Sequence, residues 1–446
     1  MKKFVISLIL SFVLFFSFSF SSYAAEFTAT VDGVKTGNLV TNTSYSSKTN
    51  IKANSTVEVT SETNISSFYV VWYKVPGPWK VNDTLTIDSG FLREFVELDT
   101  PATSFKFTPQ EDCAICYIKV FAEGETIPDD IQRWEKPLDQ ADVMAFSPHA
   151  DDESLFLGGA VVDILANHPD AKVQLVYMTN HIKSECFREN ERLDALWTLG
   201  LRNYPIIGEF PDAYAMDSLE AGLHVCDYDG ILAWFIELIN EKKPQVIITV
   251  DFNGEYGHAQ HMVQTKAVCE AVEKCAADGT HDVKKLYVHL YKDSGAMRLD
   301  LRQPLDAYGG MTALDVQKEA YKKHLSQQWC WFYVDDEYKY SCAEFGLYRT
   351  TVPADTGNDM MENITTYQAI KEEEERIAAE KAAQEAANKP QKNENDKKEN
   401  KSSNIFKKIL FAILGIILAL IVATVLLRLY NKSRKSKRYQ PKHGSK

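Results

Sequence analysis

The chain has 446 residues, and its 62 acidic side chains outnumber its 49 basic ones, which leaves a formal charge of −13. Many of the basic residues lie at the two ends of the chain, so the long middle part is strongly acidic and unsuited to binding nucleic-acid phosphates. Wholesale disorder is also excluded, because 45% of the residues are hydrophobic and 11% are aromatic.

A secretory signal peptide is expected at residues 1–24. Two lysines precede an apolar run from Phe4 to about Phe20, and small residues such as Ala24 suit cleavage. An uncleaved anchor helix is the alternative interpretation of this run. Either way, the sequence predicts that the large middle part of the chain is exported.

A second apolar run, from Ile409 to Leu427, contains no charged side chain and is long enough to cross a bilayer. Basic residues come after it, and by the positive-inside rule they place the tail at 431–446 in the cytoplasm. We therefore expect a transmembrane anchor at 405–430 and an extracellular body on a cell membrane, as on a Gram-positive surface. Residues 353–404 are expected to form a helical and disordered stalk between them.

Residues 25–138 are expected to form an all-β sandwich. Short alternating runs such as Ser67–Lys74 and Cys116–Ala122 are separated by residues typical of turns. Trp72, Tyr73 and Trp79 would stack on sugar rings if they were exposed, and are otherwise core or turn aromatics.

All eight cysteines lie in the expected extracellular body, where an even number allows disulfides whose pairing the sequence leaves open. Cys113 and Cys116 form a C-x-x-C pair. Because no thioredoxin-like pattern surrounds this pair, we interpret it as structural, with a redox role as the weaker alternative.

Residues 139–352 alternate between apolar strand candidates and helix candidates. The expected strands are 142–146, 172–178, 205–207, 246–250 and 286–291, and the expected helices are 153–167, 184–199, 228–241 and 261–276. Repeated strand–helix units predict a Rossmann-like α/β fold with a mostly parallel sheet. Such sheets bind ligands at the carboxyl ends of their strands.

Side chains that can bind a metal or transfer a proton come shortly after two of these strands. His149, Asp152 and His261 would supply two imidazoles and a carboxylate, which is a three-ligand set for Zn²⁺ or another divalent metal with a fourth position for water. Asp151 is then a candidate general base. His258 would donate to an oxyanion or protonate a leaving amine.

Each of these features has a plainer explanation when it is taken alone. An Asp-Asp-Glu run at a helix start is favourable through capping and the helix dipole. A His-x-x-His pair is common by chance. Their joint occurrence after parallel-strand candidates is what favours a metal site.

Residues 148–153 have the sequence P-H-A-D-D-E, and residues 257–261 have the sequence G-H-A-Q-H. These segments resemble the P-H-P-D-D-E and G-H-x-D-H motifs of the LmbE-like, or PIG-L, de-N-acetylases. Shorter similarities at 188–191, Asp212 and 324–327 complete an ordered set within Ala141–Arg349.

The resemblance implies a Rossmann-like domain that hydrolyses N-acetyl groups of amino sugars with one divalent metal, usually zinc. It implies these roles: metal ligands His149, Asp152 and His261; general base Asp151; oxyanion stabiliser or acid His258, with Tyr256; and sugar contacts Arg188 and Asp212.

The chain departs from the motifs at two positions. Ala150 replaces the proline, and Gln260 replaces the aspartate between the two histidines. That aspartate would favour a charged His258, whereas a glutamine is expected to orient the ring without adding charge. The change weakens the case for acid catalysis by His258 but not the case for a metal site.

Together these patterns predict a surface-anchored zinc-dependent de-N-acetylase acting on an N-acetylated sugar or cell-envelope glycan, with no nucleic-acid partner. The alternative is a non-catalytic glycan-binding surface protein built on a degenerate deacetylase fold, which Gln260 favours.

Overall fold

The computed structural model describes residues 26–387, apart from residues 42, 182–185, 294–295 and 329–333. By compactness the chain divides into residues 1–375 and residues 376–446. The expected signal peptide, the transmembrane anchor and the basic tail lie outside the described residues. Among the helices that are described, none is both long and apolar enough to cross a membrane.

The N-terminal region is all-β apart from the short helix α2 (Asn38–Thr41), as its alternating pattern predicts. Its strands are β1 (Phe27–Val31), β2 (Val34–Lys35), β3 (Thr49–Ile51), β4 (Val57–Lys74), β5 (Trp79–Val81), β6 (Leu85–Ile87), β7 (Arg93–Pro109) and β8 (Cys113–Ala122). All eight are linked by antiparallel hydrogen bonds into one sheet. The register of β4 shifts between Thr60 and Ser67, and such bulges let one long strand bend and continue.

Of the three candidate sugar-stacking residues, Tyr73 is half-buried, whereas the two tryptophans belong to the core of this region. Trp72 and Trp79 are buried and pack edge to face, with ring centroids 5.4 Å apart. These two rings are therefore unavailable for stacking on a sugar. Cys113 and Cys116 are both buried in β8, and Cys226, Cys269, Cys275 and Cys342 are free thiols.

Glu94 in β7 is a buried carboxyl whose titration is expected to affect stability. Burial raises its pKa to about 7, although hydrogen bonds from Ser89 and Phe91 act in the opposite direction. Because the pKa of Glu94 is higher in the folded state than in the unfolded state, the folded protein binds the Glu94 proton more tightly. Protonation of Glu94 therefore stabilises the fold; this contribution is complete below about pH 4.5 and is lost as the pH rises through about 7.

We therefore expect Glu94→Gln to unfold at the same temperature as the wild type at pH 5 and at a higher temperature at pH 8. At about 1.4 kcal/mol per pKa unit, the difference in unfolding free energy at pH 8 is of order 3 kcal/mol. Thermal unfolding of both proteins at several pH values measures it. A difference that did not change with pH would contradict this role for Glu94.

The second region contains a seven-stranded sheet in the order β11-β10-β9-β12-β13-β15-β14. Its strands are β9 (Val143–Ser147), β10 (Val173–Asn180), β11 (Ile206–Pro211), β12 (Val246–Thr249), β13 (Lys285–His289), β14 (Ala296–Arg298) and β15 (Glu344–Thr350). The first five strands of the order pair in parallel, and β15 and β14 add an antiparallel edge. The Rossmann-like, mostly parallel sheet predicted from the alternation is therefore present.

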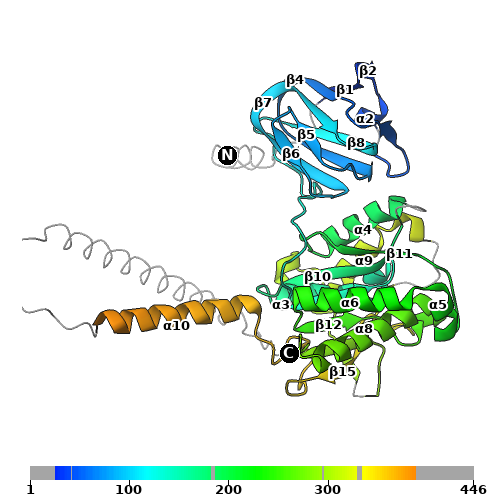
Figure 1. Ribbon diagram of the computed structural model, residues 1–446, viewed down its shortest axis with the longest axis vertical. Helices are drawn as coiled ribbons and strands as arrows, with labels where there is room; N and C mark the ends of the chain where they lie inside the picture. Colours follow the sequence, from blue (N-terminus) through cyan, green and yellow to red (C-terminus); the bar gives the residue numbers. More distant parts are fainter. Residues whose placement is uncertain (1–25, 42, 182–185, 294–295, 329–333, 388–446) are drawn as a thin grey trace, which may run out of the picture. The chain divides into compact units, whose positions relative to one another are not determined.

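Helices cover both faces of this sheet (Figure 1). They are α3 (Gly158–Asn167), α4 (Cys186–Thr198), α5 (Leu219–Val225), α6 (Tyr228–Lys242), α7 (Gly254–Gly257), α8 (Ala259–Ala277) and α9 (Ala313–Tyr321), and α10 (Tyr367–Ala387) comes after the sheet. Alternate residues of β9 separate the two cores: Val143 and Ala145 pack with α3, α4 and α9, whereas Met144 and Phe146 pack with α6 and α8. This two-sided burial explains the continuous apolar strands.

Helix α4 is held by the β-rich region as well as by the sheet. The buried guanidinium of Arg93 in β7 pairs with Asp194 at 2.6 Å and donates to the Asn190 carbonyl at 2.7 Å. Leu92 N–H donates to the Tyr204 hydroxyl at 3.1 Å. The β-rich region therefore braces the helix that also carries residues of the candidate site.

Candidate metal centre

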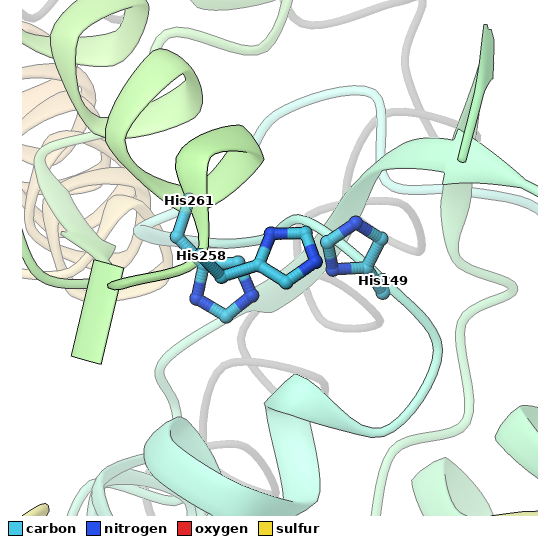
Figure 2. Close-up of side chains that lie close together, drawn as sticks. All are labelled: His149, His258 and His261. Carbon is cyan, nitrogen blue, oxygen red and sulfur yellow. The ribbon is translucent and has the colours of Figure 1, made fainter. Parts of the chain in front are cut away.

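Three histidines come together where β9 and β12 end. His149 lies in the loop after β9, His258 precedes α8, and His261 lies in the first turn of α8. Figure 2 shows their rings gathered in one place, and one nitrogen from each ring lies within 4.8 Å of the others. All three side chains are buried.

Asp152 joins this cluster, as the predicted ligand set requires. Its Oδ2 atom lies 2.9 Å from His149 Nδ1 and 3.2 Å from His261 Nε2. The two imidazoles and the carboxylate thus face one another, although His149 and His261 are 112 positions apart along the chain. The structure also brings His258 close enough to be a further ligand.

The donor set fits a cation. His261 Nδ1 lies 2.6 Å from Glu255 Oε2, and the buried Nε2 on the other side of the ring faces the Asp152 carboxylate at 3.2 Å. Burial disfavours a charged imidazole, yet Asp152 and Glu255 outweigh it and raise the pKa of His261 to about 10. The negative charge that favours a proton here equally favours a metal ion.

Glu255 is a further candidate residue of the site, and the sequence did not reveal it. It contacts His261 on one side, and its Oε1 lies 2.8 Å from Nδ1 of His289 on the other. Its backbone has a left-handed φ of 52°, which is strained for a non-glycine residue. Orienting a ligand imidazole through its second nitrogen is the usual role of such a carboxylate. Only the fold places Glu255 beside His289, which lies 34 residues further on.

The carboxylate of Asp151, the candidate general base, lies 3.4 Å from the Arg188 guanidinium. Its φ of 141° is also unusual for a non-glycine residue and is held by Glu153, which accepts a hydrogen bond from its backbone N–H. Burial raises the pKa of Asp151 to about 6, although Arg188 opposes the shift. His324, in the matched 324–327 segment, in turn contacts Glu153 at 2.6 Å.

Arg188 and Asp212 lie at the partly open side of the cluster. They are 3.5 Å apart, and Asp212 also lies 3.2 Å from His181 Nε2 and 3.6 Å from His149 Nε2. The structure therefore brings both expected sugar-contacting residues to the metal-binding cluster. His181 was not singled out from the sequence, because nothing local links it to Asp212.

Gln260 does not orient His258, which corrects the expectation drawn from its place in the motif. Its side-chain carbonyl instead lies 2.8 Å from Nε2 of His149 and accepts a hydrogen bond from Ala213 N–H at 3.0 Å. Its amide group donates to the Pro211 carbonyl at 3.1 Å. The first turn of α8 turns this side chain toward β11, so Gln260 links a candidate metal ligand to the segment that carries Asp212.

Tyr256 and His258 complete the cluster of predicted residues. The Tyr256 ring lies 5.8 Å from the rings of both His258 and His261. Burial lowers the pKa of His258 to about 2, so its imidazole is neutral here and suited to donating a hydrogen bond rather than a proton.

This region combines a mostly parallel α/β sheet with buried imidazoles and carboxylates at the carboxyl ends of its strands. Such an arrangement is typical of metal-dependent enzyme domains. Residues 144–272 match the family model PIG-L, described as GlcNAc-PI de-N-acetylase. The resemblance inferred from the motifs is therefore confirmed over residues 144–272.

Two relatives bear the name 1D-myo-inositol 2-acetamido-2-deoxy-alpha-D-glucopyranoside deacetylase. The protein of Mycolicibacterium smegmatis is 30% identical over 155 residues, which cover 28% of this chain and 52% of the relative. That of Salinispora arenicola is 40% identical over 53 residues, which cover 12% of this chain and 17% of the relative. The chain thus spans about half or less of the length of these curated relatives.

Among solved structures, the chain is similar to N,N'-diacetylchitobiose deacetylase from Pyrococcus horikoshii. The sequence identity is 15% and the TM-score is 0.30, over 44% of this chain and 74% of that chain.

Proposed function

We propose that this protein is a metal-dependent amide hydrolase that removes the acetyl group from an N-acetylated amino sugar in a glycan or glycoconjugate. One observation carries the proposal: His149, Asp152 and His261 meet within a PIG-L domain, with the second carboxylate, Asp151, beside them. The relatives named for removing acetyl groups from amino sugars support the same reaction class.

His149, Asp152 and His261 would hold the metal, for which we propose zinc, and their imidazole and carboxylate donors match its preferences. A divalent cation held there supplies Lewis acidity for amide hydrolysis. Within this chain, Glu255 orients His261 and Gln260 orients His149 through the second nitrogen of each ring.

The remaining residues have distinct tasks in the reaction. Asp151 accepts a proton from the attacking water as the general base and passes it to the amine, so that the carbon–nitrogen bond breaks and acetate and the free amino group are released. His258 donates a hydrogen bond to the oxygen that becomes negative when water adds to the acetamide carbon, and Tyr256 lies against its ring. Arg188 and Asp212 bind hydroxyl groups of the sugar at the partly exposed side of the cluster.

We further propose that the body lies outside the cell and that residues 405–430 anchor it in the membrane. The support is the uncharged run from Ile409 to Leu427 and the basic residues after it. An extracellular location favours an envelope glycan as the substrate.

Metal content and acetate release test the proposal together. The purified protein is expected to contain about one equivalent of zinc by elemental analysis and to release acetate from N-acetylglucosamine oligomers, with loss of activity after chelation and recovery with zinc. Bound zinc without acetate release from any N-acetylated glycan would favour the glycan-binding alternative. Absence of bound metal would reject the site itself.

A further inference from the structure

His289, the last residue of β13, is completely buried, and the proposed reaction does not involve it. Its two ring nitrogens have separate partners. Nδ1 lies 2.8 Å from Glu255 Oε1, and Nε2 lies 2.8 Å from the carbonyl oxygen of Ser341. The rings of Phe156 and Phe345 pack against the imidazole, each with its centroid 5.3 Å away. A ring held in this way has one orientation, so it can fix the position of a neighbouring group.

Both partners of His289 are hydrogen-bond acceptors. A carbonyl oxygen carries no hydrogen, so Nε2 donates to Ser341. The Glu255 carboxylate accepts a hydrogen bond from the Asp251 N–H at Oε1, and its Oε2 faces Nδ1 of His261. Nδ1 of His289 is then a third donor to the same carboxylate. A ring that donates from both nitrogens is an imidazolium, and its hydrogen bond to a carboxylate is of the strong, charge-assisted kind.

The contacts of Glu255 connect His289 to the candidate metal centre. A metal at His261 takes the lone pair of Nε2, so the hydrogen of that ring has to be on Nδ1, where Glu255 Oε2 accepts it at 2.6 Å. Glu255 has a left-handed φ of 52°, and a strained backbone of this kind persists only where surrounding contacts hold it. Its Oε1 receives two such contacts, from the Asp251 N–H and from His289.

We propose that His289 is a positioning residue of the metal centre. It holds the Glu255 carboxylate toward His261 and so keeps the hydrogen of the His261 ring on Nδ1, which leaves Nε2 available to the metal. The contacts run from α8 through α7 and β13 to the Ser341 carbonyl ahead of β15. The antiparallel edge of the sheet thereby takes part in the metal centre. This inference rests on the proposed function, because it needs a metal at His261.

Two substitutions separate the two contacts of His289. The amide nitrogen of His289→Asn replaces Nδ1 and can donate to Glu255, whereas that of His289→Gln replaces Nε2 and can donate to Ser341. Zinc affinity, measured by competition with a chelator, is expected to fall about tenfold in His289→Gln and to stay within about threefold of the wild type in His289→Asn. Both variants lose the same buried ring, so thermal unfolding of the metal-free proteins should show similar losses of stability. Lost packing therefore does not explain a difference in zinc affinity between them.

Equal zinc affinities in His289→Gln and the wild type would overturn the inference, and so would a loss of affinity that His289→Asn shares. If neither variant folds, the ¹⁵N NMR spectrum of the wild-type imidazoles decides: hydrogens on both nitrogens of His289 support the inference, and a hydrogen on Nε2 alone rejects it. If zinc binds in the expected pattern but no acetate is released, the proposed reaction fails and the inference stands. A wild-type protein that binds no zinc would reject both.

Discussion

Replacing Asp151 with asparagine is expected to lower kcat for acetate release by about 10²- to 10⁴-fold, because the amide has the same shape but accepts no proton from water. Asp151 is buried, lies 3.4 Å from Arg188, and has a φ of 141° that Glu153 holds in place. Steady-state kinetics on an N-acetylglucosamine oligomer measures the change.

The bound zinc content should not change in this variant, since Asp152, not Asp151, faces His149 and His261. Asp170→Asn, at an exposed turn, is the matched control and should keep the wild-type kcat. If Asp151→Asn kept full activity with normal zinc, another group would be the base. If it lost zinc, Asp151 would be a ligand.

Replacing Gln260 with alanine is expected to weaken zinc binding by about 10- to 100-fold, which is the usual effect of removing a group that orients a metal-binding histidine. The Gln260 carbonyl lies 2.8 Å from His149 Nε2 and leaves Nδ1 of that ring facing Asp152. Without this partner, the His149 ring can rotate or change tautomer. Competition with a chelator of known affinity measures the dissociation constant without reference to activity.

Gln264→Ala provides the control for this experiment. Gln264 is a buried glutamine one turn further along α8, and its amide donates to the Phe146 carbonyl at 3.0 Å. Its loss should cost stability but leave zinc affinity within about threefold of the wild-type value. Equal zinc affinities in Gln260→Ala and the wild type would show that the contact with His149 does not position the ligand.

The role of Gln260 shows how far local patterns reach. A glutamine between two histidines is expected to act on His258, because sequence neighbours are the partners that a motif suggests. In the structure the helix turns its side chain toward β11, where His149 and Ala213 are its partners. Gln260, which replaces the aspartate of the motif, therefore contacts His149 and not the neighbouring His258.

Glu255 and His181 show the opposite case, in which nothing local marks the residue. Glu255 contacts His261 and His289, and His181 contacts Asp212, across 6, 34 and 31 positions of the chain. Such partners lie at or just beyond the ends of strands that become neighbours only when the sheet forms. Local periodicity therefore carries no information about which of these residues contact one another.

The sequence by itself determined the order of the five parallel strands and the main helices between them, because burial on two faces imposes continuous apolar strands and burial on one face imposes helical spacing. It also singled out the candidate residues for metal binding and acid–base chemistry, since few side chains can perform it. Only the tertiary structure decided the antiparallel edge of the sheet and which carboxylates and amides contact the candidate ligands. Those contacts join distant segments and depend on the direction of each side chain, which folding alone fixes.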